Sequence, residues 1–368
     1  MSDAATRALD DAFLRIVADW SAGGEGCDEE RFSAHALALF AYQIERNEPY
    51  RRYARSLGFD AARLPTNWRA IPAVPASAFK DATLATFDAS QAELVFHTSG
   101  TTADRTGKHY VEKARLYDAA LVAGFDRFMV PERSRLRYLN LVPNPRVRPQ
   151  SSLGYMMGYV SVLRGDGKPE YFLGEDDVDV DGFERALDAA GAERQPVCIA
   201  GTAFAFAALV AELDARGRTF RAPAGSRIME TGGFKGRARV VERAELYASL
   251  AAALGVPESS IVAEYGMTEL LSQYYDAPES RASETRVKVA PPWLRALVVD
   301  AAGREVPSGE VGFLRHVDLA NRSSAVAIDT EDRGYARGDG IVLLGREAAA
   351  EPRGCSLDAE DLATLESR

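Results

Sequence analysis

The sequence predicts an α/β fold with layered sheets and helices around a buried core. Hydrophobic residues make up 46% and charged residues 27% of the 368 residues, which excludes a disordered, collagen-like or coiled-coil architecture. Short apolar runs of strand length recur along the chain, and several are followed by helical patterns. This alternation indicates an α/β core, and the runs are 93–96, 138–142, 197–200, 226–230 and 261–264.

Four regions follow one another along the chain. Residues 1–80 are predicted to form a helical N-terminal cap, with apolar residues at helical spacing, and an extended connection in which three prolines resist a long helix. Residues 81–290 form the α/β core. Residues 291–345 form a small β subdomain, with strand-like runs at 294–299, 312–317 and 341–344, and residues 346–368 are a polar tail.

Charge, cysteine content and hydropathy exclude several classes of protein. A net charge of −10 argues against nucleic-acid binding. Three scattered cysteines are too few for a disulfide framework or a zinc site, which fits a reducing cytoplasm. The charged N-terminus does not resemble a secretion signal. The most apolar run, Val197–Ala211, is shorter than a bilayer-spanning helix, so we expect a cytoplasmic protein with no membrane span.

A loop rich in hydroxyls and glycines follows the predicted strand 93–96. Residues 97–109 read HTSGTTADRTGKH, and such a loop brings N–H and O–H donors close to phosphate oxygens. The segment therefore predicts a phosphate site. The P-loop pattern is not met, because six residues separate Gly100 from Gly107 and His109 follows Lys108. A Ser/Thr-rich surface turn is the alternative.

Two further segments carry residues that suit a nucleotide site. Residues 264–269 read EYGMTE after a predicted strand, and a carboxylate beside a glycine turn at a strand end suits a hard cation or an attacking group. Residues 335–340 read YARGDG, where Asp339 could accept hydrogen bonds from ribose hydroxyls. The alternative for Asp339 is a simple turn-forming role.

In this order, the three segments resemble the adenylate-forming enzymes, the superfamily of acyl-CoA synthetases and nonribosomal adenylation domains. The resemblance implies that the loop binds ATP phosphates, that Thr268 contacts the α-phosphate and that Glu269 helps to bind Mg²⁺. Gly345-Arg346 matches the start of the hinge motif, whereas Ala103 stands where these enzymes usually have glycine. The nucleotide-binding residues implied, including three expected beside the adenine, are Thr98, Ser99, Gly100, Thr101, Thr102, Gly232, Gly233, Phe234, Tyr265, Gly266, Thr268 and Asp339.

A closer resemblance, covering nearly the whole chain, is to the acyl-protein synthetases of the bacterial bioluminescence operon, which supply fatty acyl groups to a fatty-acid reductase. It rests on residues 97–102, 229–237 (METGGFKGR), 264–269 and 353–357 (RGCSL). That family lacks the large mobile C-terminal domain of ordinary synthetases. We expect the same here, with residues 346–368 forming a truncated hinge and a tail that carries Cys355.

Two catalytic roles follow from this resemblance. Full-length relatives use a lysine of the mobile domain for adenylation, and this chain has no lysine beyond Lys288. Lys108 or Lys235, with Arg237, is expected to supply that charge instead. Cys355 corresponds to the cysteine that carries the acyl group as a thioester, since a thiolate attacks a mixed anhydride. On its position alone, Cys355 would instead be read as an exposed thiol without function.

The acyl pocket is expected at the carboxyl ends of the strands, where ligands of open α/β sheets bind. Many of the candidates could instead be core residues, because apolar side chains near a strand end usually pack. His97, next to the loop, could orient a substrate carboxylate or phosphate, or form a structural hydrogen bond. The pocket candidates are Tyr155, Met156, Met157, Gly158, Gly201, Thr202 and Phe204.

The sequence therefore predicts a ligase that uses ATP and Mg²⁺ to convert a carboxylic acid, expected to be a fatty acid, into an acyl-adenylate. Pyrophosphate is released and the acyl group passes to a thiol, first Cys355 and then a reductase or carrier protein. One alternative is a ligase that transfers the acyl group from the adenylate directly to coenzyme A or a carrier protein. A second is a non-catalytic nucleotide- or acyl-binding protein.

Overall fold

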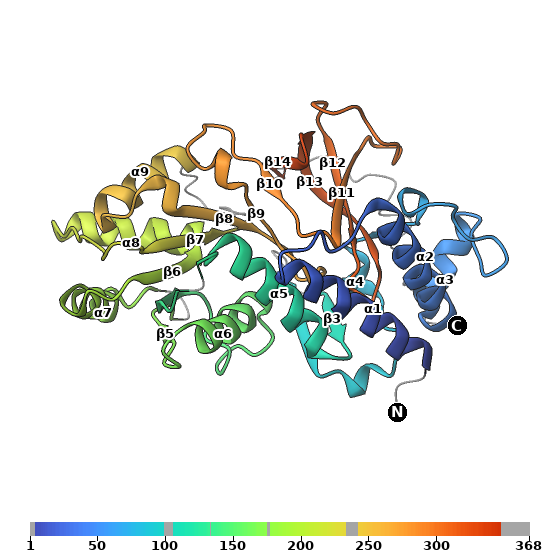
Figure 1. The fold of residues 1–368 in the computed structure, drawn as a ribbon, viewed down its shortest axis with the longest axis horizontal. Coiled ribbons are helices and arrows are strands. Elements are labelled where there is room, and N and C mark those ends of the chain that lie inside the picture. Colours follow the sequence, from blue (N-terminus) through green and yellow to red (C-terminus); the bar gives the residue numbers. More distant parts are fainter. Residues whose placement is uncertain (1–3, 99–105, 133, 175–176, 233–241, 347–368) are drawn as a thin grey trace. The chain divides into compact units, whose positions relative to one another are not determined.

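The computed structural model describes residues 4–98, 106–132, 134–174, 177–232 and 242–346 (Figure 1). The chain divides into two compact units. The first unit comprises residues 1–123, 267–273 and 289–368, and the second comprises residues 124–266 and 274–288. The four-part division expected from the sequence stays a prediction.

The second unit is built on a mainly parallel sheet. Its strands are β4 (Arg137–Leu141), β5 (Glu170–Tyr171), β6 (Val197–Thr202), β7 (Arg227–Thr231), β8 (Ile261–Tyr265), β9 (Tyr274–Asp276) and the start of β10 (Lys288–Val289). They are ordered β5-β4-β6-β7-β8-β9-β10. The pairs from β5 to β8 are parallel, and β9 runs antiparallel to β8. The carboxyl ends of β6, β7 and β8 therefore meet at one edge of the sheet.

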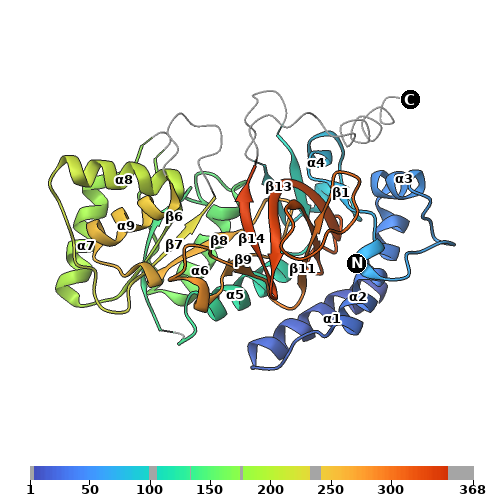
Figure 2. The ribbon, with the colours of Figure 1, turned by 90° about the horizontal axis from the view of Figure 1, so that it is seen from above.

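Helices cover both faces of this sheet, which explains why its strands are apolar runs rather than alternating patterns. Register aligns Leu139, Ile199, Ile228 and Ile261 on one face, where they share a buried core with α7 (Val180–Glu193), α8 (Ala203–Ala215) and α9 (Arg243–Leu254). On the other face, Asn140 donates to Ser161 of α6 (Ser152–Arg164) over 3.3 Å. Figure 2 shows α8 and α9 grouped beside β6 and β7. Short 3₁₀ turns lie at Glu258–Ser260 and Pro278–Ser280.

The first unit combines N-terminal helices with an antiparallel sheet. Strands β11 (Leu294–Val299), β12 (Gly312–Asp318), β13 (Ala327–Arg337) and β14 (Gly340–Gly345) pair in that order, and β1 (Val74–Pro75) runs parallel to β13. β2 (Leu94–His97) and β3 (Lys108–Val111) form a separate antiparallel pair. The helices are α1 (Ala4–Ser21), α2 (Glu29–Arg46), α3 (Glu48–Ser56), α4 (Ala78–Asp81) and α5 (Ala114–Phe128), which continues into the second unit, and 3₁₀ turns lie at Trp68–Ala70 and Ala89–Gln91.

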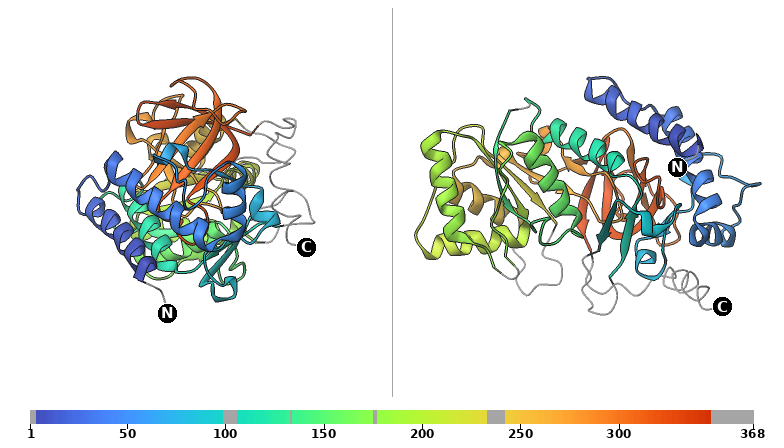
Figure 3. Two further views of the ribbon diagram at one scale, coloured as in Figure 1. Left: turned by 90° about the vertical axis from the view of Figure 1, so that its right-hand side faces the viewer. Right: turned by 90° about the horizontal axis from the view of Figure 1, so that it is seen from below.

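Buried polar contacts attach the N-terminal helices to the segment between β12 and β13. Asp10 of α1 pairs with Arg322 over 2.5 Å, and both side chains are 2% exposed. Gln43 of α2 donates to the Asn321 carbonyl over 2.7 Å. Figure 3 shows α1 and α2 as neighbouring blue helices. Helices α1 and α2 are therefore part of the folded core of the first unit.

The predicted strands are confirmed, with ends that differ by one or two residues. Strand β13 was not predicted. Its sequence, AIDTEDRGYAR, holds five charged residues, so it lacks the apolar run that marks the predicted strands. Pairing with both β12 and β14 stabilises it as a strand.

Candidate functional site

The described ends of the hydroxyl-rich loop are joined at Thr98 and Gly107. The Thr98 N–H donates to the Gly107 carbonyl over 2.9 Å, and the Gly107 N–H donates to Thr98 Oγ1 over 3.0 Å. A Cβ at position 107 would lie 3.0 Å from that oxygen and 3.1 Å from the Phe79 carbonyl, so glycine is favoured for steric reasons. Ser99, Gly100, Thr101 and Thr102 lie outside the described residues.

His97 and Lys108 face each other across the hairpin at the base of the loop. Lys108 is exposed and His97 is half-buried. Burial, and then the positive charge of Lys108, lower the pKa of His97. The imidazole is therefore uncharged at neutral pH and keeps one nitrogen as an acceptor.

Buried polar side chains hold the backbone that carries Thr268 and Glu269. His109 Nδ1 lies 2.7 Å from the Thr268 carbonyl oxygen, and Asn321 Nδ2 donates to the Glu269 carbonyl over 2.8 Å. Two residues later, the Leu271 N–H donates to the Asp318 carboxylate over 2.9 Å. The Glu269 residue itself is 8% exposed, whereas Thr268 is half-buried. No sequence pattern assigned a role to His109, Asn321 or Asp318.

Asp339 occupies the turn between β13 and β14. Arg337 and Gly340 are paired, so Gly338 and Asp339 form a two-residue hairpin loop. Gly338 has φ of +58°, the conformation that a glycine adopts readily at the first position of such a turn. The Asp339 side chain is exposed. Its turn-forming role is thus seen in the fold, and its ribose contact stays a prediction.

The second unit carries the remaining nucleotide candidates at adjacent strand ends. Thr231, the last residue of β7, is the register partner of Glu264 on β8, and its hydroxyl donates to the Glu264 carboxylate. Gly232 follows with φ of +73° and open space around it. Tyr265 is buried against the ring of Tyr274, with ring centroids 5.7 Å apart. Gly233, Phe234 and Lys235 lie outside the described residues.

Glu264 is a buried carboxyl group at this strand end. Burial raises the pKa of Glu264 to about 7, while the hydrogen bond from Thr231 and the charge of Lys288 act in the opposite direction. Glu230, one position before Thr231, is also buried and accepts a hydrogen bond from Tyr247 of α9 over 2.9 Å. Both carboxyls therefore have designated polar partners inside the unit.

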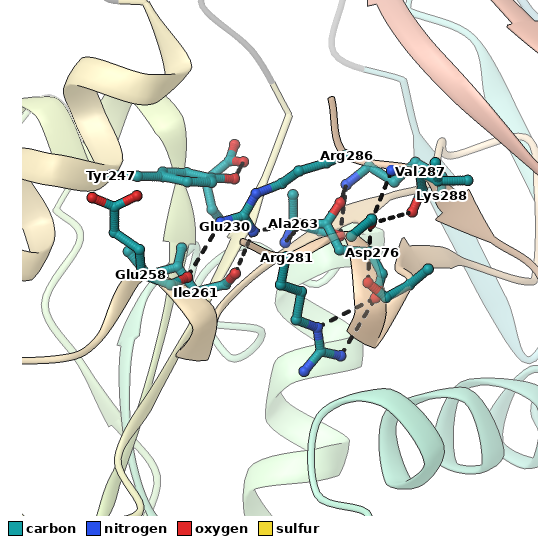
Figure 4. Close-up of polar contacts among 12 residues, drawn as sticks. Glu230, Tyr247, Glu258, Ile261, Ala263, Asp276, Arg281, Arg286, Val287 and Lys288 are labelled. Carbon is teal, nitrogen blue, oxygen red and sulfur yellow. Dashed lines mark hydrogen bonds and ion pairs between the residues drawn. The ribbon is translucent and has the colours of Figure 1, made fainter. Parts of the chain in front are cut away.

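A cluster of charged side chains lies beneath these strand ends (Figure 4). Lys288 Nζ lies 2.7 Å from Asp276 Oδ1 and donates to the Ala263 carbonyl over 2.7 Å. Arg286 pairs with the other oxygen of Asp276 over 2.9 Å. Lys288 is 1% exposed, so its ammonium group stabilises β8 and β9 and is not presented to a ligand. The signal that could have predicted this cluster is the presence of Glu230, Glu264 and Asp276 within otherwise apolar strands.

The structure brings the acyl-pocket candidates into the second unit, where several have packing roles. Met156 and Met157 are buried in α6. A Cβ on Gly201 would lie 3.0 Å from Leu141 and Phe206, and Thr202 caps α8 by accepting from Ala205 N. Tyr155 stacks on Tyr159 at 6.1 Å, Gly158 lies close to Pro145, and Phe204 is 37% exposed. The acyl pocket stays a prediction.

The cysteines differ in what can be said of them. Cys198 is fully buried, and burial raises its pKa to about 12, which confirms the expected inert core thiol. Cys27 is also buried. Cys355 lies outside the described residues, as does Arg237. Among the residues that the structure describes, no three His, Cys, Asp or Glu side chains gather as metal ligands.

None of the described helices is both long enough and apolar enough to cross a membrane.

Solved structures show that the fold is that of the adenylate-forming enzymes. 2-Hydroxyisobutyryl-CoA ligase in an open conformation, in complex with 2-HIB-AMP and CoA, matches with a TM-score of 0.62 and 13% identity, over 85% of this chain and 69% of that one. Its postadenylation state in complex with 2-HIB-AMP matches with a TM-score of 0.62 and 14% identity, over 90% of this chain and 72% of that one. McyG A-PCP complexed with phenylalanyl-adenylate matches with a TM-score of 0.50 and 16% identity over 71% of this chain, which spans about half (48%) of that one.

The sequence comparisons then give the family. Residues 5–363 match the family described as "Acyl-protein synthetase, LuxE", and the chain belongs to this family. It is 22% identical to the "Long-chain-fatty-acid--luciferin-component ligase" of Vibrio harveyi, over 99% of this chain and 96% of that protein. It is also 22% identical to the protein of the same name from Aliivibrio fischeri, over 86% of this chain and 85% of that protein. The resemblance inferred from the motifs is confirmed.

Proposed function

We propose that this protein is an ATP-dependent acyl-protein synthetase that activates a long-chain fatty acid and passes the acyl group to a protein thiol. Family membership over residues 5–363 carries the proposal. The names of the two relatives favour a long-chain fatty acid and a protein acceptor. The buried free thiols Cys27 and Cys198 fit action in a reducing cytoplasm.

The proposed nucleotide contacts are those that the resemblance to the adenylate-forming enzymes implies. In the first unit, the loop 98–107 would hold the phosphates with its hydroxyl and N–H groups, and Asp339 would accept bonds from the ribose. The bonds between Thr98 and Gly107 support this role, because they hold the two ends of the loop together. In the second unit, Gly232 to Phe234 and Tyr265 would contact the adenine. The exposed Gly232 backbone, with open space around its Cα, suits a close approach to a planar base.

Mg²⁺ is the proposed cofactor, with Glu269 as its protein ligand. The donor set fits, because Mg²⁺ at phosphoryl-transfer sites takes one or two carboxylates and completes its shell with phosphate oxygens and water. When bound, the ion neutralises charge on the phosphates. The Glu269 backbone is held by Asn321, which favours a defined position for its carboxylate.

The proposed reaction has two steps. A carboxylate oxygen of the acid attacks the α-phosphorus of ATP, the bond from the α-phosphorus to the bridging oxygen breaks, and pyrophosphate leaves with the electron pair. The thiolate of Cys355 then attacks the acyl carbonyl carbon, the carbon–oxygen bond to AMP breaks, and AMP leaves. Lys108 is exposed at the end of the loop and, with Lys235, is proposed to offset the charge that develops on the α-phosphate.

Intact mass spectrometry tests this proposal. The protein is incubated with ATP, Mg²⁺ and a panel of fatty and aromatic acids, and pyrophosphate release is followed in parallel. We expect a hydroxylamine-sensitive acyl adduct in the wild type and in Cys27→Ser, a matched control, but none in Cys355→Ser. The acid that gives the most adduct defines the substrate class.

The other outcomes separate the alternatives. Pyrophosphate release without an adduct would indicate direct transfer from the adenylate to coenzyme A or a carrier protein, and Cys355 would lose its role. Absence of both, with every acid tried, would favour a non-catalytic binding protein and would overturn the proposal.

A further inference from the structure

His109 connects two segments of the first unit that are 159 residues apart. It is the second residue of β3, directly after Gly107 and Lys108, and its side chain is on the buried face of the strand with no exposed surface. Its Nδ1 atom lies 2.7 Å from the carbonyl oxygen of Thr268. The strand that closes the hydroxyl-rich loop therefore contacts the backbone of the EYGMTE motif directly.

The chemistry of this contact defines the tautomer. A carbonyl oxygen only accepts hydrogen bonds, so Nδ1 must carry the hydrogen and donate it. Burial lowers the pKa of His109 to about 4, although its bond to Thr268 and the nearby Asn321 amide act in the opposite direction. The imidazole is therefore neutral at physiological pH, and its Nδ1–H bond persists across the neutral range.

A third residue, Phe79, supports both segments. Its ring meets the His109 ring edge to face, with centroids 5.5 Å apart and an interplanar angle of 78°. The Phe79 backbone carbonyl also lies against Gly107, where an added Cβ would approach within 3.1 Å. The end of the loop and the Thr268 backbone thus share one support, made of Phe79 and His109.

Asn321 completes the support at the next residue. Its Nδ2 donates to the Glu269 carbonyl over 2.8 Å, and Asn321 is fully buried. Consecutive carbonyls, those of Thr268 and Glu269, are each held by a buried side-chain donor. A backbone that is held at two consecutive carbonyls can project its side chains in few directions. This arrangement therefore restrains the Thr268 hydroxyl and the Glu269 carboxylate together.

We propose that His109 is a positioning residue for MgATP: by donating Nδ1–H to the Thr268 carbonyl, it holds Thr268 and Glu269 in register with Thr98 and Gly107, the described ends of the loop. The inference rests on the proposed function, in which those residues contact phosphate and Mg²⁺. His109 itself touches neither reactant nor metal. Its loss should therefore weaken the use of MgATP without affecting recognition of the acid.

The test compares His109→Leu with His109→Asn in acid-dependent ATP–pyrophosphate exchange. Leucine fills the space but cannot donate, whereas the asparagine amide can donate from near the position of Nδ1. We expect His109→Leu to raise the KM for MgATP and the Mg²⁺ concentration for half-maximal exchange by about tenfold, as expected for loss of one buried hydrogen bond. The KM for the acid should stay unchanged, and His109→Asn should restore most of the loss.

His35→Leu is the matched control. His35 is a buried imidazole of α2 whose pKa is also lowered by burial to about 4, so this variant loses a buried histidine without touching Thr268. Thermal melting of each variant separates misfolding from mispositioning. A His109→Leu enzyme that melts like His35→Leu but has a higher KM for MgATP supports the proposal. Equal KM values for MgATP in the two variants would overturn it.

Failure of the proposed function gives a different result. If the wild type shows no exchange with any acid, the proposed reaction is wrong, and the same variants are compared by equilibrium binding of MgATP. Weaker nucleotide binding in His109→Leu alone would still support the positioning role. Equal binding in all variants, or none in the wild type, would refute it.

Discussion

Replacing Glu264 with glutamine should remove a pH-dependent part of the stability of the second unit. The Glu264 residue is 6% exposed and accepts a hydrogen bond from Thr231. Burial raises its pKa from the ordinary 4.5 to about 7, against the opposing effects of Thr231 and Lys288, and with a smaller contribution from Glu230 in the same direction as burial. Glutamine has the same shape and can still accept from Thr231, so the substitution removes the ionisation and little else.

The sign follows from proton linkage. A carboxyl whose pKa is raised by folding binds its proton more tightly in the folded state, so its contribution is fully present below the unfolded pKa and is lost as the pH rises through the folded pKa. The difference between 4.5 and about 7, at about 1.4 kcal/mol per pH unit, corresponds to about 3 kcal/mol. Most of this stabilisation, about 2.5 kcal/mol, is lost as the pH rises from 5 to 8.

Urea unfolding at pH 5 and pH 8 measures this effect in the wild type, Glu264→Gln and Glu245→Gln, a control at an exposed position of α9. The three tryptophans, Trp20, Trp68 and Trp293, belong to the first unit. Circular dichroism and hydrogen exchange of residues 261–265 therefore report the second unit better than tryptophan fluorescence. Glu264→Gln should become more stable relative to the wild type by about 2.5 kcal/mol from pH 5 to pH 8. Parallel pH profiles for these two proteins would refute the reasoning.

Three further predictions concern stability and the loop. Lys288→Met should destabilise the second unit by about 3 kcal/mol in urea unfolding, because Asp276 would lose a buried partner. Lys113→Met, at an exposed pair with an N–O distance of 2.8 Å, should cost at most about 1 kcal/mol. Equal losses of stability in the two variants would contradict the role of burial. Gly255→Ala should lower the melting temperature by more than Gly217→Ala, since both glycines have positive φ but only a Cβ at 255 meets a backbone oxygen, at 2.8 Å. Equal melting temperatures of the two variants would contradict this prediction. Gly107→Ala should reduce ATP–pyrophosphate exchange with little change in melting temperature, because a Cβ there would push against Thr98 Oγ1 and the Phe79 carbonyl. An unchanged exchange rate would show that the base of the loop tolerates the added methyl group.

Several conclusions could be reached from the sequence because their signals are local. Apolar runs predicted β4, β6, β7 and β8, since burial on both faces requires continuous apolar residues, and strand-like runs predicted β11, β12 and β14. The order of the loop 97–109, the EYGMTE motif and Asp339 predicted the adenylate-forming fold, and the added phrases 229–237 and 353–357 predicted the family. These conclusions depend on which residues are present and in what order, which a sequence states directly.

Only the tertiary structure decided the contacts between residues that are distant in the chain. Nothing near His109 in the sequence indicates that it donates to Thr268, or that Thr231 donates to Glu264. Lys288, noted from the sequence only as the last lysine, is held by Asp276 and the Ala263 carbonyl. Such partners depend on strand order and register, which are set by packing across the whole unit rather than by any local pattern. The sequence thus determined the fold and the family, and the tertiary structure decided which side chains hold the candidate site in place.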